Sequence, residues 1–189
     1  MKNLFSFLAI FALSFFNSQS LTESQKFWQN LEKHCGKSYE GVITAGGKEG
    51  DGFMGQRLVM QVLSCEPNRI RIPFYVGENK SRTWVLKKNK KQILKLKHDH
   101  RQEDGSEDKV TQYGGESTNH GFENLQMFPA DAETAKRIGF ASTNVWWITL
   151  DEKTFTYNLR RIGSDRLFTV TFDLTKPINY NEKPWGWKE

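Results

Sequence analysis

Apolar and polar residues alternate with a period of two along most of the chain after residue 38. Phe155, Tyr157 and Leu159, for example, are separated by polar residues. This alternation is typical of antiparallel strands with one buried face. It predicts ten strands, at about 39–45, 56–65, 68–76, 81–88, 92–101, 109–113, 122–128, 143–150, 154–161 and 166–173.

Two segments follow the spacing of a helix instead. The residues Thr22–Gln25 match a capping box and precede a stripe of apolar residues, which predicts a helix over about 22–35. A second, short helix is predicted at about 131–138, with Asp131 as its N-cap and Gly139 as its stop.

Short turns connect the predicted strands, so each strand is expected to pair with the next one along the chain. Ten such strands with one leading and one late helix favour an antiparallel up-and-down β-barrel. Closure into a barrel removes the exposed edges that an open sheet of this size would present. A two-sheet β-sandwich is the alternative, although few long crossover connections are visible. Residues 21–189 suit a single domain.

The first twenty residues have the pattern of a secretory signal peptide. Lys2 precedes an apolar run over 4–16, and small residues follow at Ser18 and Ser20. The run is too short for a membrane anchor. We therefore expect cleavage near Ser20, a mature chain that begins at Leu21 without a transmembrane segment, and a secreted or periplasmic location. A buried N-terminal helix is the alternative.

An exported protein meets an oxidising compartment, where two cysteines most often form a disulfide. The sequence has two, and we expect a Cys35–Cys65 disulfide. Loss of Lys2 with the signal peptide lowers the formal net charge from +5 to +4. The basic run 87–91 lacks the interleaved aromatic residues of a strand-binding groove, so we expect a solvated hairpin tip and no nucleic-acid partner.

Several motifs resemble those of a known family. The segments 82–86 and 94–101, the acidic segment Glu103–Asp108 and the motifs Tyr113-Gly114-Gly115 and Cys35-Gly36 resemble a family of secreted bacterial proteins of uncharacterised function. This resemblance spans most of the mature chain and implies export, but no activity. In architecture, a helix followed by a glycine-containing first strand and an antiparallel meander is similar to the calycins, the barrel group of lipocalins and fatty-acid-binding proteins.

The most distinctive candidate chemistry lies in one hairpin. The dipeptide Asp104-Gly105 predicts a two-residue type I′ turn. Counting outward from this turn pairs His98 with Thr111. The same register pairs Leu96 with Tyr113. One face of the hairpin then carries the candidate site residues Leu94, Leu96, His98, His100, Thr111 and Tyr113.

That face begins apolar and ends polar, as a strand does when it runs from a barrel interior to its mouth. A ten-stranded barrel has more room than side chains alone fill. We therefore expect a non-enzymatic module that binds a small, largely apolar molecule, with the glycine-rich loop 46–55 as a flap. The polar members of the set would orient the ligand, and Leu94 and Leu96 would belong to its apolar walls. A solid core made of the same apolar residues is the alternative.

Two other functions stay open. His98 and His100 project from one face of a strand and can approach one divalent transition metal or a haem, so a metal- or haem-binding protein is the first alternative. A small exported enzyme with these two residues and Tyr113 at its mouth is the second alternative. The sequence contains no catalytic motif that names a substrate, and the first hypothesis requires no cofactor.

Overall fold

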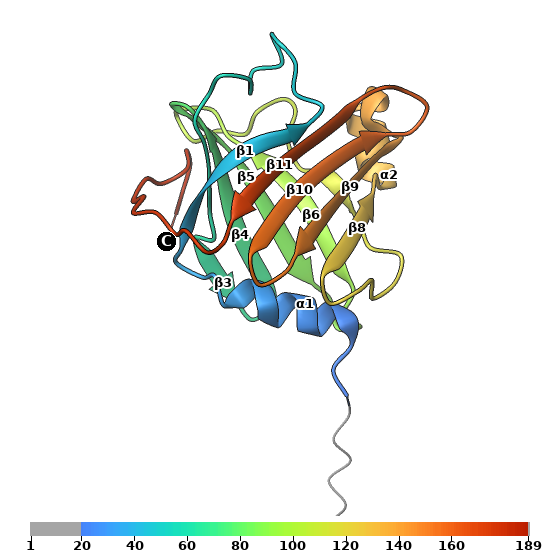
Figure 1. The fold of residues 1–189 in the computed structure, drawn as a ribbon. Coiled ribbons are helices and arrows are strands. Elements are labelled where there is room, and N and C mark those ends of the chain that lie inside the picture. The colour runs from blue at the N-terminus through green and yellow to red at the C-terminus, as the bar shows by residue number, and fades with distance from the viewer. Residues whose placement is uncertain (1–19, 189) are drawn as a thin grey trace, which may run out of the picture.

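Antiparallel strands dominate the structure, a computed structural model that describes residues 20–188 (Figure 1). The predicted signal peptide therefore lies, apart from Ser20, outside the described residues. The elements in chain order are α1 (Glu23–Glu32), β1 (Ser38–Ala45), β2 (Leu58–Gln61), β3 (Ser64–Glu66), β4 (Arg69–Val76), β5 (Asn79–Lys88), β6 (Leu94–His100), β7 (Tyr113–Glu116), β8 (Leu125–Pro129), α2 (Ala132–Arg137), the 3₁₀ turn η1 (Gly139–Ala141), β9 (Asn144–Leu150), β10 (Thr154–Arg161) and β11 (Leu167–Asp173).

Ten of these strands form one nearly closed barrel in the order β7-β6-β5-β4-β2-β1-β11-β10-β9-β8. Neighbours in this order pair antiparallel, and β11 returns to pair with β1. The short β3 pairs with β4 off this path. The predicted mostly β, up-and-down barrel with a leading and a late helix is confirmed.

The barrel closes at a seam between β7 and β8, the two ends of the strand order. Gly115 approaches β8 so closely that a Cβ there would overlap the carbonyl oxygen of Pro129. The start of α2 completes the closure. The Asp131 N–H and the Thr134 hydroxyl both donate to the Gly114 carbonyl, at 3.0 and 2.8 Å. The edges of β7 and β8 at the seam are thus covered by their close contact with each other and by the start of α2.

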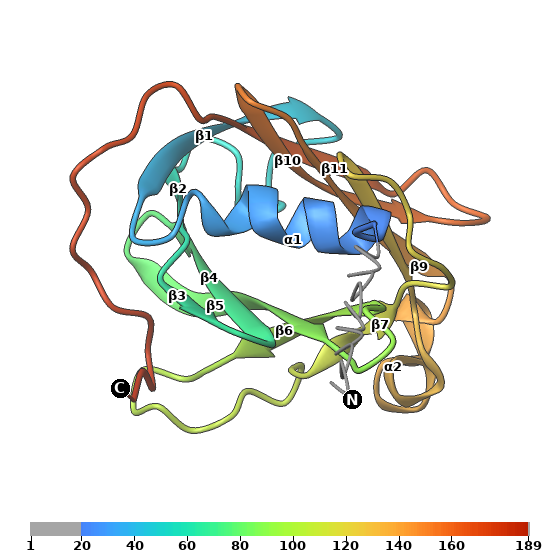
Figure 2. The ribbon, with the colours of Figure 1, turned by 90° about the horizontal axis from the view of Figure 1, so that it is seen from below.

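The helix α1 lies across one end of the barrel, here named the closed end (Figures 1 and 2). The predicted capping box is present, because the Gln25 N–H donates to the Thr22 hydroxyl and the Thr22 N–H donates to Gln25 Oε1. Phe27 and Leu31 on the inner face are fully buried. Within residues 20–188, no helix is long and apolar enough to cross a bilayer.

A disulfide joins the end of this helical lid to the barrel. Cys35 follows α1 and is bonded to Cys65 in β3, with a Cα–Cα distance of 6.2 Å. The predicted pairing is confirmed. Because β3 is itself paired with β4, the disulfide ties the lid to the sheet.

The sequence predicted one strand over 56–65, where the structure has β2 and β3. Between them the chain changes partners. The Val62 N–H donates to the Lys37 carbonyl at 2.9 Å, whereas the next N–H, of Leu63, donates to Arg71 in β4 at 3.0 Å. A continuous apolar pattern does not reveal such a change, since both halves stay buried or half-buried.

The turn between β6 and β7 also differs from the prediction. Asp104-Gly105 lies inside a longer loop, in which the Gln102 N–H donates to the Ser106 carbonyl at 2.8 Å. A second irregularity follows at Gln112, whose φ of 57° is left-handed. The predicted two-residue turn is therefore wrong, and β7 covers Tyr113–Glu116 rather than about 109–113.

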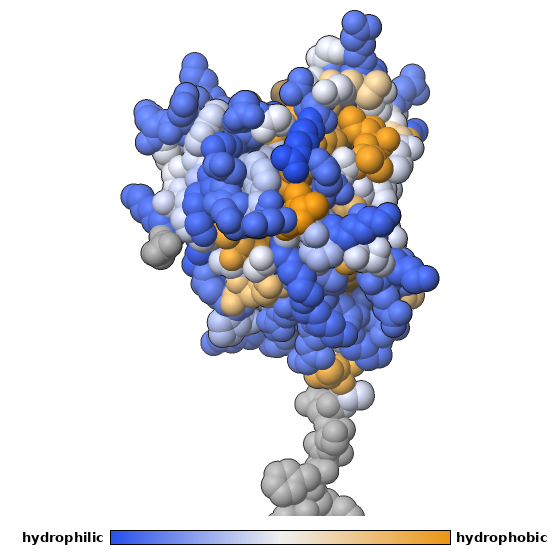
Figure 3. All heavy atoms as spheres, turned by 60° about the vertical axis from the view of Figure 1, so that its left-hand side comes forward, coloured by the Kyte–Doolittle hydropathy of each residue, from blue (hydrophilic) through white to orange (hydrophobic). Residues whose placement is uncertain are grey.

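The C-terminal tail runs along the outside of the barrel (Figures 1 and 2). Tyr75 on β4 donates its hydroxyl proton to the Glu182 carbonyl at 2.9 Å. Further on, the Arg71 guanidinium lies 3.9 Å from the ring centre of Trp187. Hydrophilic side chains dominate the face on this side of the molecule, with apolar side chains gathered near its middle and upper right (Figure 3).

Candidate functional site

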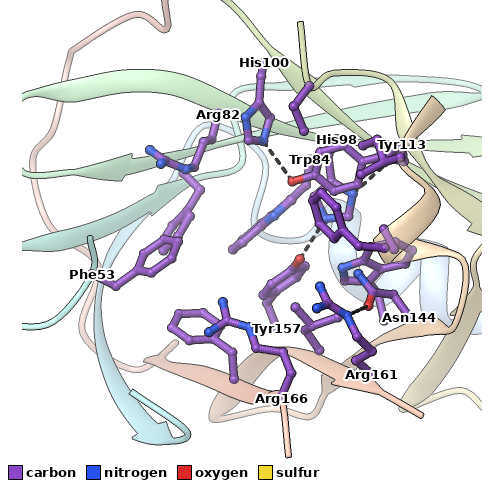
Figure 4. A pocket seen from close by; sticks show the side chains of 18 residues that line it. Phe53, Arg82, Trp84, His98, His100, Tyr113, Asn144, Tyr157, Arg161 and Arg166 are labelled. Carbon is purple, nitrogen blue, oxygen red and sulfur yellow. Dashed lines mark hydrogen bonds between the residues drawn. The ribbon is translucent and has the colours of Figure 1, made fainter. Parts of the chain in front are cut away.

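A cavity of about 210 Å³ opens at the end of the barrel opposite α1, here named the open end (Figure 4). Strands β4 to β7 and β9 to β11 contribute to it, together with the glycine-rich loop and η1. Eight of its lining residues are aromatic: Phe53, Phe74, Trp84, Tyr113, Phe140, Trp146, Tyr157 and Phe168. The others are Arg82, His98, His100, Val110, Ile138, Ala141, Asn144, Leu159, Arg161 and Arg166.

One wall of the cavity is a stack of nearly parallel rings. Phe74 and Trp84 have ring centres 4.7 Å apart at an interplanar angle of 16°. Trp84 and Tyr157 follow at 4.3 Å and 15°. The first two are diagonal neighbours on β4 and β5, and Tyr157 joins them from β10 across the barrel interior. The three rings cover one another's faces and leave Trp84 only 2% exposed, so they form a rigid apolar wall.

A second wall comes from β6, β7 and β9. His98 pairs with Tyr113, and their rings stack at 4.5 Å and 10°. Trp146 packs against the His98 ring at 5.1 Å. His98 does not pair with Thr111 as predicted, because Gln112 shifts the register. The Thr111 hydroxyl instead accepts a hydrogen bond from the His100 N–H at 2.7 Å.

Both ring nitrogens of His98 have partners. Nδ1 lies 3.1 Å from the Tyr113 carbonyl oxygen, which only accepts, so Nδ1 carries the proton. Nε2 then accepts the Tyr157 hydroxyl proton at 2.7 Å. Burial and, secondly, the neighbouring His100 lower the pKa of His98 to about 3. The ring is therefore neutral at pH 7, and burial raises the pKa of Tyr157 well above its ordinary value.

His100 lies nearer the mouth of the cavity. Its Nε2 is 3.2 Å from the Tyr113 hydroxyl. Burial, followed by the positive charge of Arg82, lowers the pKa of His100 to about 4. Burial raises the pKa of Tyr113 to about 12. These groups are thus uncharged at neutral pH and act as hydrogen-bonding aromatic surfaces.

Charge enters the cavity lining through three arginines. Arg161 donates from Nε to the Asn144 side-chain oxygen at 2.9 Å. Arg82 lies over the Phe53 ring, with 5.3 Å between the guanidinium carbon and the ring centre. Arg166 comes from the turn side of β11 (Figure 4).

The structure separates the residues that the sequence selected. His98, His100 and Tyr113 line the cavity together. Leu94 and Leu96 are completely buried in the core nearer the closed end, where Leu96 pairs with Gly115 rather than with Tyr113. Both leucines and Thr111 lie outside the cavity lining.

Sequence reasoning missed the arginines and the tryptophans of the lining. A signal for them existed in the alternation of the strands. Arg82 stands two residues from Trp84, and Arg161 two residues from Leu159, so each shares an inward face with an apolar neighbour. A cation at the end of such a face is expected where water reaches it, because lysine and arginine are almost never fully buried unless paired.

The His-x-His pair is poorly arranged for a metal. Both nitrogens of His98 are engaged in hydrogen bonds. Within residues 20–188, no three His, Cys, Asp or Glu side chains are grouped as metal ligands would be. The residues present therefore do not favour the metal- or haem-binding alternative.

Comparison with known proteins yields no relative, since no protein-family model, curated protein or solved structure matches the chain significantly. The resemblance to a secreted bacterial family stays a prediction. At the level of architecture, the nearly closed antiparallel barrel is compatible with the calycin-like shape.

Proposed function

We propose that the protein is a non-enzymatic module that binds a small, largely apolar molecule in the cavity at the open end. The observation that carries this proposal is the cavity of about 210 Å³ with eight aromatic side chains in its lining. An engineered apolar cavity of about 150 Å³ binds benzene. A molecule with one or two rings fits this site.

The polar groups of the site support binding rather than acid–base catalysis. A general acid or base works best when its pKa is near the working pH. The pKa values of His98 and His100 are about 3 and about 4, and that of Tyr113 is about 12. Such groups orient a ligand by hydrogen bonds without exchanging protons with it at pH 7.

We also propose that binding takes place outside the cytoplasm, in the periplasm or after secretion. The signal-peptide pattern of residues 1–20 supports this location. The Cys35–Cys65 disulfide supports it as well, because disulfides persist in oxidising compartments.

Titration with prodan, a neutral naphthalene dye with two rings whose emission changes in apolar surroundings, tests the proposed function. We expect saturable one-to-one binding and quenching of tryptophan fluorescence, since Trp84 and Trp146 line the cavity. Absence of saturable binding by this dye and by smaller aromatic probes would overturn the proposal.

A matched pair of variants locates the binding site. Ala141 is 2% exposed and lines the cavity, so Ala141→Phe fills the space that the ligand needs and is expected to abolish binding. Ala135→Phe makes the same change on the exposed surface of α2 and is expected to leave binding intact. Circular dichroism and thermal unfolding establish that both variants fold. Equal binding by both would place the dye elsewhere.

A further inference from the structure

The cavity lining changes in chemistry along the barrel axis. At the mouth, Arg82 on β5 pairs with His100 on β6, and one inward step deeper Trp84 pairs with His98. The same order occurs across the barrel. There Arg161 pairs with Asn144 at the mouth, whereas Leu159 and Trp146 pair deeper. The cavity thus has an aromatic floor and a cationic rim.

The cationic rim lacks local compensation. The lining contains three arginines and no aspartate or glutamate, so its formal charge is +3 with both histidines neutral. Within residues 20–188, Arg82, Arg161 and Arg166 are not within 4.0 Å of any carboxylate oxygen. In contrast, Arg57, Arg69, Arg71, Arg101 and Arg137 each form such an ion pair.

Two carboxylates act on the rim only from a distance. The negative charge of Asp108 favours the charged form of Arg82, and the positive charge of Arg166 lowers the pKa of Asp51. Neither pair is close enough to form an ion pair. Asp51 is itself engaged by the backbone N–H groups of its own loop, including that of Phe53 at 2.8 Å. The guanidinium groups of the rim are therefore open to a bound anion.

Arg161 at the end of β10 and Arg166 directly before β11 are placed to act together. The Arg161 N–H donates to the Arg166 carbonyl at 3.0 Å across the turn between these strands. The bond from Arg161 Nε to Asn144 holds that guanidinium and leaves its terminal nitrogens free to donate. The Arg166 side chain makes no hydrogen bond within the described residues. Both reach the cavity from one side, with Arg82 on the other (Figure 4).

We propose, on the basis of the proposed function, that the ligand is an amphipathic carboxylate. Its planar apolar part lies among the aromatic side chains of the cavity floor. Its carboxylate lies at the mouth, where Arg161 and Arg166 hold it. A guanidinium matches a carboxylate with two parallel hydrogen bonds, and such charge-assisted bonds are stronger than neutral ones.

Two probes of the same shape distinguish the contribution of the negative charge to binding from that of the apolar rings. The probe 2-naphthoate is ionised at pH 7, whereas 2-naphthamide is its neutral counterpart. Calorimetric titration is expected to show that the naphthoate binds about tenfold more tightly, as a charge-assisted hydrogen bond implies. Added salt is expected to reduce this preference, because ions screen the rim.

The double variant Arg161→Gln/Arg166→Gln is expected to lose the preference, because the affinity for naphthoate falls much more than the affinity for naphthamide. Arg160→Gln is the matched control. This residue neighbours Arg161 on β10, is exposed, and lies on the outer face of the strand. The control is expected to keep the preference. Both changes replace exposed or half-exposed side chains, and circular dichroism checks the folds.

Each outcome has one consequence. Equal affinity of the wild type for both probes would overturn the anionic ligand and leave the proposed function in place. Failure of both probes to bind would overturn the two proposals together. A preference for naphthoate that survives in the double variant would overturn the assignment to Arg161 and Arg166.

Discussion

The two ends of this barrel are built from the same strands and differ in almost everything else. At the closed end, α1 covers a core of aliphatic and aromatic side chains, and a disulfide fastens the lid. At the open end, aromatic rings and arginines surround a cavity. This difference shows that one half of each strand can contribute to the stable core while the other half lines a binding cavity.

The change from core to cavity can be followed along a single strand. From the closed to the open end, the inward face of β5 carries Leu86, Trp84 and Arg82 in succession. The first is completely buried in the core, and the other two line the cavity. The side chains thus change from aliphatic to aromatic to cationic, and each step suits a wetter environment than the one before.

The largest expected effect is on the free energy of unfolding when one phenylalanine at each end is replaced by alanine. Phe27 of α1 is completely buried at the closed end, and Phe27→Ala is expected to lower the free energy of unfolding by about 3–5 kcal/mol. Phe140 at the open end is 66% exposed, and Phe140→Ala is expected to change it by less than about 0.5 kcal/mol.

Chemical denaturation measures both phenylalanine variants, and dye titration adds a second readout. Phe140 lines the cavity, so its loss is expected to weaken dye binding although stability is kept. Similar losses of stability in the two variants would show that the ends do not differ as described.

The disulfide at the closed end is expected to have the next largest effect. Replacement of Cys35 and Cys65 by serine frees a loop with a sequence separation of 30. The chain-entropy model then gives a loss of about 3–4 kcal/mol. Denaturation of the variant, compared with wild type under oxidising and reducing conditions, measures this loss. Dye affinity is expected to stay unchanged, and a marked fall in affinity would contradict the independence of the two ends.

Mild acid is expected to weaken the open end through its buried histidines. The folded protein holds the pKa of His98 at about 3, below the ordinary 6.5, so the unfolded chain takes up the proton first. This contribution to stability is complete above pH 6.5 and is lost as the pH falls toward 3. Between pH 7 and pH 5 the loss expected from His98 alone is about 1–2 kcal/mol.

The variant His98→Gln supplies the control for this pH dependence. It is expected to be less stable at pH 7 and to lose less further stability at pH 5, as followed by urea denaturation. Carboxylates titrate mostly below about pH 5 and therefore do not contribute in this window. An unchanged slope in the variant would mean that other groups cause the acid sensitivity, such as His100 or His34, whose pKa values are also lowered by burial.

The strands were predictable because their signal is local. The segment 154–161 matches β10 in full, since its alternation reflects which side of the sheet each residue faces. The register of β6 and β7 was not predictable in the same way. Gly105 has a φ of 85° within a longer loop, and Gln112 adopts a left-handed conformation. Both depend on contacts that the turn dipeptide does not reveal.

The site was predictable only in part. His98, His100 and Tyr113 stand out by their residue types in a polar stretch of hairpin. Arg161 on β10 and Arg166 before β11 lie far along the chain from this hairpin, and barrel closure alone brings the two sides together. How deep each inward-facing residue lies in the barrel depends on the stagger of the strands, which a single sequence does not reveal.

The seam between β7 and β8 has a consequence for the order of folding. Hydrogen-bonded closure occurs where β1 meets β11, with Gly41 opposite Phe172, and this pairing encloses almost the whole domain. Loop-closure entropy grows with loop length, and long-range pairing slows folding. The seam, in contrast, brings together β7 and β8, which are separated by only a short loop and form no ladder of hydrogen bonds with each other. We therefore expect the two ends of the chain, rather than its middle, to set the rate at which the barrel forms.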